Sequence, residues 1–392
     1  MRTANADQWK ISGALDQAME YDDNIGLQVI ETPALGYSMR PSVNAEWSTS
    51  VMEWGVSGQG DIRRYDDERW DCENFSLETD YRYITRRNVF SLAGSYSQSC
   101  SYAQQARDTG ILLPGSQSEN YSLSPTWAWQ ISPRDTLSVS PSYSQISYTN
   151  GVGSLSGANA ATLRNNKSYG LNLSAEHHWH KRFSSNIGLF FSRSDFGNSG
   201  TAFNQSASAQ DVFGFQAGGQ YALSRSWSIN LGAGGRWVQS PGMESGLNFG
   251  QIANVAINYK GRHDNYALTY SRSVSPSGFG QVQEVGSLGV KYAYEFNREL
   301  SLNINGNYFE NQLVGQRQTV FGLQKREYYE ASAEFVWKFA REWRLSASYR
   351  YRMQDYASGT NSQSASLVDG VRDSNAVMLH LNYNWDGLRE GR

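Results

Sequence analysis

The chain has no long run of apolar residues. None of its segments reaches the 18 or more consecutive apolar residues that indicate a transmembrane helix. This excludes membrane-spanning helices but not a transmembrane β-barrel, because barrel strands alternate apolar and polar residues and leave no such run. The mean hydropathy of −0.59 therefore does not decide whether the protein lies in a membrane.

Charge of one sign, cysteine and proline are also scarce. With 34 Lys and Arg against 37 Asp and Glu, the formal net charge is −3, so the basic excess typical of nucleic-acid-binding proteins is missing. Only 2 cysteines and 8 prolines occur, whereas the chain has 52 aromatic residues (24 Tyr, 12 Trp and 16 Phe), a composition that favours β-strands. The start, residues 1–7, lacks the apolar core of a signal peptide, so we expect an exported form to have lost its signal peptide already.

Regular alternation is the strongest feature of the chain, and it is clearest in the segment 343–353. Its apolar members alternate with polar ones without a break: Trp343, Leu345, Ala347, Tyr349, Tyr351 and Met353 against Arg344, Ser346, Ser348, Arg350 and Arg352. A period of two predicts a β-strand with one apolar and one polar face. A transmembrane barrel turns such an apolar face toward lipid and such a polar face toward its lumen.

The same alternation recurs along the chain and predicts about eighteen strands. They cover residues 9–21, 35–48, 51–64, 71–84, 88–101, 119–131, 135–148, 167–179, 182–194, 209–223, 226–238, 248–260, 264–274, 282–296, 299–311, 327–339, 342–354 and 374–385. Short connections alternate with longer ones, as in outer-membrane barrels with tight periplasmic turns and longer extracellular loops. We therefore predict an all-β fold, a single antiparallel transmembrane β-barrel, with the barrel at 9–385, an N-terminal periplasmic segment at 1–8 and a C-terminal periplasmic tail at 386–392.

Tryptophan supports this prediction independently. Ten of the twelve tryptophans lie at strand ends beside the short connections, on the apolar face: Trp9, Trp47, Trp54, Trp127, Trp129, Trp179, Trp227, Trp337, Trp343 and Trp385. Indole rings prefer the boundary between lipid tails and water, so an interfacial girdle explains this sorting. A soluble β-sandwich would have no reason for it.

Charged residues of both signs occupy the opposite face of the predicted strands. The candidates that would line the lumen are Arg40, Glu46, Glu53, Asp61, Arg63, Glu78, Asp80, Arg82, Glu176, Arg236, Lys291, Glu330, Glu334, Arg344, Arg350 and Arg352. An Arg or Lys turned to lipid at the bilayer midplane would cost about 2–4 kcal/mol, so this face must meet water. We expect cross-strand ion pairs, among them pairs of Glu330 and Glu334 with the three arginines of 344–352. The lumen could be a path for carbohydrate or a generic solvated channel.

The cysteines, the histidines and the acidic segments each allow more than one interpretation. Cys72 and Cys100 lie near the outer ends of adjacent strands and could form a disulfide or remain free thiols, and the alternation places them on different faces unless a bulge intervenes. His178 and His180 share the lumen face, but no third ligand is near, so we expect an interfacial histidine cluster and no metal site. The acidic segments 20–24 and 66–68 are either calcium sites or solvated loop tips.

Several short motifs together resemble a known family. They are Glu20 to Asn24, the Arg-Pro-Ser of Arg40 to Ser42, Arg64-Tyr65 before an acidic loop, Asp108-Thr109-Gly110, and the run from Ser124 to Asp135. This combination resembles the outer-membrane β-barrel porins that are encoded in exopolysaccharide gene clusters. The resemblance covers residues 9–150 best, and beyond them it rests on the barrel pattern alone.

The resemblance implies a function and partners. From the barrel pattern itself we expect a monomeric, integral outer-membrane protein with both termini in the periplasm, surrounded by lipopolysaccharide and phospholipid. The resemblance implies that this barrel is a conduit. It would export a secreted polysaccharide passively, without cofactor or chemistry, and receive it from a periplasmic polysaccharide-export protein. The alternatives are a general or sugar-selective diffusion porin and a barrel enzyme that acts on lipid or polymer.

Overall fold

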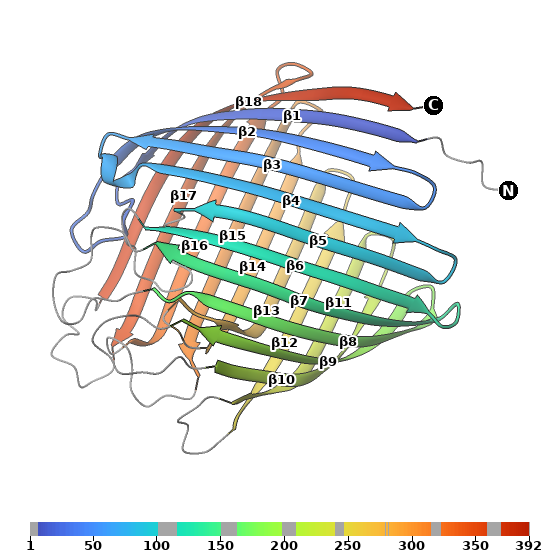
Figure 1. Ribbon diagram of the computed structural model, residues 1–392. Coiled ribbons are helices and arrows are strands. Elements are labelled where there is room, and N and C mark those ends of the chain that lie inside the picture. The colour runs from blue at the N-terminus through green and yellow to red at the C-terminus, as the bar shows by residue number, and fades with distance from the viewer. Residues whose placement is uncertain are drawn as a thin grey trace.

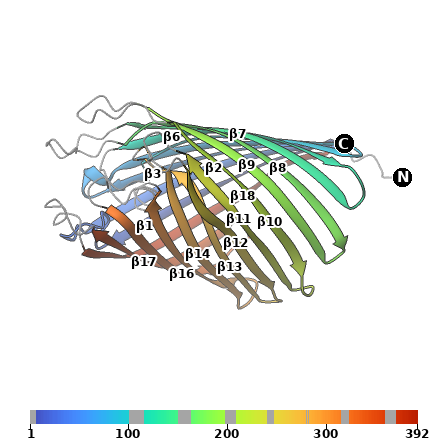
Figure 2. The same cartoon turned by 90° about the horizontal axis from the view of Figure 1, so that it is seen from below.

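The protein is a closed antiparallel β-barrel of eighteen strands, as the sequence predicts. The computed structural model describes residues 7–100, 116–149, 163–197, 209–239, 247–278, 280, 282–314, 323–358 and 370–391. Each strand pairs with its neighbour in sequence, and the pairing of β1 with β18 closes the sheet (Figure 1). Figure 2 shows the same wall turned by 90°, with β10 to β14 running side by side. Within these residues no helix is long and apolar enough to cross a membrane.

The strands follow one another without intervening domains. Their bounds are β1 Gln8–Asp22, β2 Ala34–Ser48, β3 Met52–Tyr65, β4 Cys72–Ile84, β5 Asn88–Ser99, β6 Gln117–Gln130, β7 Asp135–Thr149, β8 Asn166–His180, β9 Phe183–Phe196, β10 Ala209–Ala222, β11 Trp227–Gln239, β12 Asn248–Lys260, β13 Asp264–Pro276, β14 Val282–Glu295, β15 Leu300–Leu313, β16 Leu323–Trp337, β17 Trp343–Ser358 and β18 Gly370–Gly391. One 3-10 turn, η1, covers Glu68–Trp70 between β3 and β4.

The outer surface of the barrel is apolar, which is the reverse of a soluble protein. Large apolar side chains of one strand parity are exposed on almost every strand; on β9, for example, Ile187, Leu189 and Phe191 are 58%, 57% and 44% exposed. Nine of the ten tryptophans predicted to form the girdle are among these exposed groups, and the rings of Trp9 and Trp47 stack at 5.9 Å. Such a surface requires acyl chains around it, so the fold is that of an integral outer-membrane barrel.

The two ends of the barrel differ, and we call them the turn end and the loop end. At the turn end, connections such as 85–87 are closed by local hydrogen bonds: the backbone N–H of Thr85 donates to the carbonyl of Asn88 at 2.8 Å, and the Thr85 hydroxyl accepts from the backbone N–H of Asn88 at 3.0 Å. At the loop end the connections are longer. The start of β1 and the end of β18 lie at the turn end (Figure 1).

The last strand is longer than the sequence indicates. Residues 386–391, expected to form a tail, continue β18 and pair with β1 from Gln8↔Gly391 to Ile11↔Leu388. A bulge separates this segment from the pair Gly13↔Trp385, and Gly387 provides the positive φ of +76° that it requires. The bulge shifts the alternation of apolar and polar residues by one position. For this reason the sequence pattern does not reveal that the strand continues past Trp385. Residues 1–6 of the expected N-terminal segment lie outside the described residues.

One ladder is incomplete. Strands β12 and β13 pair at eight positions, from Ala253↔Arg272 to Lys260↔Asn265, which is fewer than between any other neighbouring strands in the described part of the chain. Toward the loop end, residues 248–252 of β12 remain paired with β11, and 273–276 of β13 remain paired with β14, but not with each other. The wall is therefore split there.

Candidate transport path

The inner face of the barrel has two sectors with different chemistry. Most of the inward-facing ionic side chains lie on a sector that we call the charged wall, β16 to β18 with β1 to β4. The sector from β5 to β10, which we call the hydroxyl wall, carries mainly serine, asparagine and glutamine on its described residues, with Glu176 as its one inward carboxylate. A solute in the lumen would therefore meet an ionic surface on one side and a neutral polar surface on the other.

At the loop end of the charged wall, two arginines of β17 bind acidic residues of β1. Arg352 donates to Asp22 at 2.6 Å and Arg350 donates to Glu20. The Arg352 side chain is 5% exposed and that of Asp22 is fully buried, and the hydroxyl of Ser374 donates to the second carboxylate oxygen of Asp22 at 2.7 Å. A buried pair with these additional hydrogen bonds fixes the relative position of β17, β18 and β1.

Midway along the charged wall, the carboxylate of Asp61 on β3 is shared by two arginines. Arg63 donates to it at 2.7 Å and Arg40 of β2 at 3.3 Å, while Arg40 also lies 3.8 Å from Asp16 of β1. Asn74 of β4 donates to the same carboxylate at 3.3 Å. The network thus links four consecutive strands along the inner face.

Toward the turn end the charges are more exposed. Lys10 lies 3.7 Å from Glu46, and Arg82 lies 3.6 Å from Glu53; the Glu46 and Glu53 side chains are 61% and 55% exposed. The remaining predicted groups of this region are on the inner face of β4 and β17, where Glu78, Asp80 and Arg344 oppose Ser57, Gly55 and Asn382. Exposed pairs of this kind contribute about 0–1 kcal/mol to stability, so they mainly set the local potential in the lumen.

The other predicted lining residues are dispersed around the barrel. Glu334 accepts from the amide of Asn303 at 3.2 Å and Glu330 accepts from the hydroxyl of Tyr328 at 3.0 Å. Glu334 and Lys291 border a cavity of about 640 Å³ near the turn end, together with asparagines of β12, β13 and β15. Glu176 lies 3.5 Å from His178, and Arg236 of β11 pairs with Glu284 of β14.

On the hydroxyl wall, neighbouring strands are connected by bonds between side-chain hydroxyls. Ser95 and Ser122 are 2.7 Å apart, Thr126 donates to Ser140 at 3.1 Å, and Ser168 and Ser194 are 3.0 Å apart. Hydroxyls both donate and accept, so these groups retain further capacity for a solute with hydroxyls of its own.

The connection between β1 and β2 folds into the lumen at the loop end. Leu27 is 2% exposed and packs against Tyr328 and Phe309, which belong to the inner faces of β16 and β15. Leu27 has a φ of +45°, a left-handed conformation that is unfavourable for a β-carbon-bearing residue. The surrounding contacts must therefore hold this backbone in place.

Those contacts come from several strands. The side chain of Asn24 accepts from the backbone N–H of Gln28 at 3.0 Å and donates to the carbonyl of Asp373 on β18 at 3.0 Å. Ile25 of the same connection packs with Trp70 of η1, whose side chain is 2% exposed, and with Ala34. The β1–β2 connection is thus a packed part of the structure that narrows the lumen on the side of the charged wall.

The end of the β13–β14 hairpin narrows the lumen from another side. Val282 is 2% exposed and packs against Val212 and Val238 on the inner faces of β10 and β11. The backbone N–H of Val282 donates to the side chain of Gln210 at 2.6 Å. The hairpin end therefore leaves its own place in the wall and covers the inner face of its neighbours.

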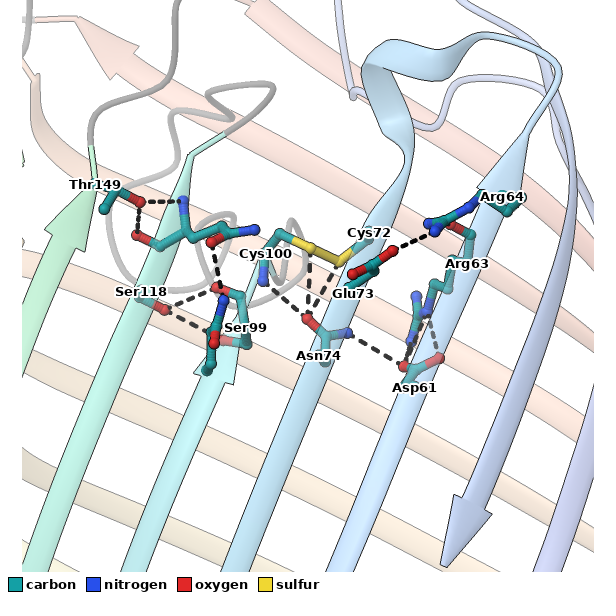
Figure 3. The surroundings of a disulfide bond; sticks show 12 residues. Asp61, Arg63, Arg64, Cys72, Glu73, Asn74, Ser99, Cys100, Ser118 and Thr149 are labelled. Carbon is teal, nitrogen blue, oxygen red and sulfur yellow. Dashed lines mark hydrogen bonds and ion pairs between the residues drawn. A yellow bond between two sulfur atoms is a disulfide. The ribbon is translucent and has the colours of Figure 1, made fainter.

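A disulfide joins Cys72 and Cys100 at the loop end of β4 and β5, with their Cα atoms 5.8 Å apart (Figure 3). No bulge is needed, because β5 ends at Ser99 and Cys100 lies beyond the ladder, free of its alternation. The amide oxygen of Asn74 accepts from the backbone N–H of Cys100 at 2.8 Å, and its nitrogen reaches Asp61. The disulfide thus adjoins the arginine network of the charged wall.

Within the described residues, no group of three or more His, Cys, Asp or Glu side chains is arranged so that it could hold a metal ion. His177 approaches Asp135 at 2.7 Å, and the ring of His177 packs against Trp179. In the acidic connection 66–68, the carboxylate of Asp67 accepts hydrogen bonds from the guanidinium of Arg69, which lowers the pKa of this exposed carboxyl.

Three important positions were not identified from the sequence. Asp22 was placed in an acidic segment that was interpreted as either a calcium site or a solvated loop tip, although it continues the inward parity of β1 by one step and is fully buried. For Glu284 and Leu27, the neighbouring sequence does not indicate a role in the lumen. Glu284 has the lipid-facing parity of β14, and Leu27 is one apolar residue in a connection. Both depend on chain segments that are distant in sequence.

Comparisons with known proteins agree with this architecture. A family model described as "Putative MetA-pathway of phenol degradation" matches residues 108–251, which is less than half of the 392-residue chain. No curated protein matches the chain. Among solved structures, the chain is similar to OccAB4 of Acinetobacter baumannii, with a TM-score of 0.50, 10% identity and coverage of 99% of both chains.

A second similar structure is the apoprotein form of the FrpB iron transporter (F5-1 variant) of Neisseria meningitidis. Its TM-score is 0.51 at 6% identity, with coverage of 95% of this chain and 81% of that chain. At these identities the likeness shows a shared fold. The chain folds as outer-membrane transport barrels do.

Proposed function

We propose that the protein is an outer-membrane diffusion channel for small hydrophilic solutes, with the turn end and both termini in the periplasm. Barrels of 16–18 strands are wide enough for an aqueous channel, and the inner face here is lined by ionic, hydroxyl and amide groups. The proposal includes no catalytic step and no cofactor. Hydroxyl-rich solutes such as sugars suit the hydroxyl wall best, because each hydroxyl can exchange its bonds to water for bonds to serine.

The observation that carries this proposal is the packed β1–β2 connection inside the lumen. Leu27 is buried on the inner faces of β15 and β16, and Asn24 bonds to β18, so the connection spans part of the opening. A conduit for a polymer needs a wide and continuous passage, whereas a narrowed mouth favours small solutes. The narrowing therefore supports the diffusion channel over the polysaccharide conduit.

Export of a secreted polysaccharide, and a periplasmic export protein as partner, remain predictions from the resemblance of residues 9–150. The same barrel could serve that function if the connections at the loop end moved out of the lumen. We do not carry over the phenol pathway named by the matched family, because the described lumen is lined mainly by polar groups.

Swelling of proteoliposomes tests the proposal. We expect rapid uptake of monosaccharides, slower uptake of disaccharides and no uptake of long neutral polysaccharides. In planar bilayers, long polysaccharide should leave the ion current unchanged. A current that is blocked by polymer at low concentration, or uptake that does not fall with sugar size, would instead favour the polysaccharide conduit. Shortening of the polymer during incubation would favour the barrel enzyme.

A matched pair of variants tests whether the β1–β2 connection sets the size limit for sugar uptake. Leu27→Gly removes the side chain that packs on Tyr328 and suits the positive φ, so we expect larger sugars to enter. Leu35→Ala removes an exposed side chain from the lipid-facing side of β2 and should leave the size limit unchanged.

A further inference from the structure

Within the described part of the wall, the split between β12 and β13 leaves backbone groups that no ladder between these two strands pairs. The ladder stops at Ala253↔Arg272, although both strands continue toward the loop end. Edges of this kind are costly in lipid and attract any strand that can pair with them. Phe249 lies four residues beyond the last pair, and the centroid of its lipid-facing ring is 5.4 Å from that of Trp237 in a tilted arrangement. The split therefore begins within the part of β12 that this aromatic pair bounds.

The missing ladder has a clear structural cause. The end of the β13–β14 hairpin has turned inward, where Val282 joins Val212 and Val238. It also reaches the chain before β8, because the backbone N–H of Arg164 donates to the carbonyl of Gly278 at 2.8 Å. Residues that would have completed the wall are thus used to narrow the lumen.

The carboxylate of Glu284 adds ionic contacts to the valine cluster and the backbone bonds that hold the hairpin end in this inward position. Glu284 of β14 accepts from Arg236 at 2.6 Å and also pairs with Arg272. The Arg236 side chain is 2% exposed and lies across β12 at Gly250, where an added β-carbon would approach its guanidinium to 2.4 Å. Glycine at position 250 is therefore what allows Arg236 to reach over β12 to β14.

We propose that the outer half of the β13–β14 hairpin is a movable part of the wall with two positions. In the observed position it narrows the lumen and leaves the wall split. In the second position it completes the β12–β13 ladder, which closes the split and widens the mouth. The existing register continues as Ile252↔Ser273, Gln251↔Val274, Gly250↔Ser275 and Phe249↔Pro276, since each of these pairs keeps the residue-number sum of 525 that Ala253↔Arg272 has.

The two positions exchange one set of interactions for another. The inward position has the valine cluster and the Arg236–Glu284 pair, and the wall position has the additional ladder hydrogen bonds. Arg236 is the switch point, because moving Glu284 into the wall removes the partner of a buried guanidinium. The inference rests on the proposed function for its consequence, a change in solute passage, but not for the motion itself.

Cysteine pairs test the motion in the full-length barrel reconstituted in lipid. The native cysteines are bonded to each other and leave no free thiol among the described residues. Ile252→Cys with Ser273→Cys should form a disulfide under mild oxidation only when the ladder is completed. Val212→Cys with Val282→Cys should trap the inward position, and Ala256→Cys with Thr269→Cys, already opposed in the ladder, is the positive control.

We expect all three disulfides to form, with the 252–273 disulfide raising single-channel conductance relative to the 212–282 disulfide. Glu284→Gln should increase the rate of 252–273 bond formation several-fold, whereas Glu310→Gln, which alters an outward pair with Lys325, should not. Formation of the 256–269 bond without the 252–273 bond would overturn the proposal. Cross-linking that occurs as expected in a barrel that admits no sugar would refute the proposed function and leave the motion supported.

Discussion

Among the described residues, two segments occupy the lumen at the loop end, and they are held in different ways. The β1–β2 connection emerges from strands whose ladders are complete up to Asp22, and it is fixed by a buried ion pair, by the side chain of Asn24 and by Leu27. The β13–β14 hairpin end gives up its ladder with β12 and is held by Glu284 and a small valine cluster. The first segment has no unpaired strand to return to, and the second has one.

This difference teaches that a narrowed barrel need not be uniformly rigid. An inward segment with a complete wall behind it is a permanent part of the channel, because moving it gains no backbone hydrogen bonds. An inward segment that leaves a split wall has an alternative position, in which it forms ladder hydrogen bonds with the unpaired strand in place of its contacts in the lumen. The predictions below separate these two cases.

The largest effect is expected at the fixed segment. Asp22→Ala leaves the guanidinium of Arg352 buried without its carboxylate, and it should lower the free energy of unfolding by about 3–5 kcal/mol. The control is Glu53→Ala, which breaks an exposed pair with Arg82 and should cost about 0–1 kcal/mol. Denaturant unfolding in lipid vesicles measures both. Equal losses would show that the buried pair does not fix the connection.

Leu27 distinguishes packing from backbone strain within the same segment. Leu27→Ala removes the contact with Tyr328 and should cost about 2–4 kcal/mol. Leu27→Gly loses the same contact but adopts a φ of +45° without strain, so we expect it to be less destabilised than Leu27→Ala. The same unfolding experiment ranks the two variants. The opposite order would mean that the positive φ has no cost here.

Val282 tests the movable segment in the same way. Full burial of a valine is worth about 1.5–3 kcal/mol, but we expect Val282→Ala to cost below about 1 kcal/mol, because the hairpin end can move into the wall. Single-channel conductance should rise at the same time. If Val282→Ala lowered the free energy of unfolding by about 1.5–3 kcal/mol and left the conductance unchanged, both inward segments would be fixed.

The smallest effect on stability is expected on the hydroxyl wall. Ser122→Asp places a carboxylate in the neutral sector opposite Ser95, in contact with lumen water, and should change stability by no more than about 0.5 kcal/mol. It should nevertheless shift the channel toward cations, since it adds charge where none is paired. Reversal potentials in a salt gradient measure this shift, and Ser122→Asn is the neutral control.

Much of the architecture was predictable because alternation is a local property. The eighteen strands, the order of short and long connections and the lipid-facing tryptophans all follow from side chains that alternate along the chain. The inner placement of residues such as Arg40 and Glu78 follows from the same parity. The end of β18 was missed because the bulge at Gly387 shifts that parity.

The partners of the inner charges were harder to predict. Arg350 and Arg352 were expected to pair with Glu330 and Glu334 on the preceding strand, but they bond to Glu20 and Asp22 of β1. Barrel closure brings the first strand beside the last one, and long guanidinium side chains reach across an intervening strand. Sequence proximity therefore did not give the partners of these two arginines.

The sequence by itself determined the barrel, its strand number and which face meets lipid, since each depends on the alternation of apolar and polar residues along the chain. Only the tertiary structure decided how open the lumen is. The β1–β2 connection and the β13–β14 hairpin end enter it through contacts between segments far apart in sequence, and such contacts exist only after the sheet has closed.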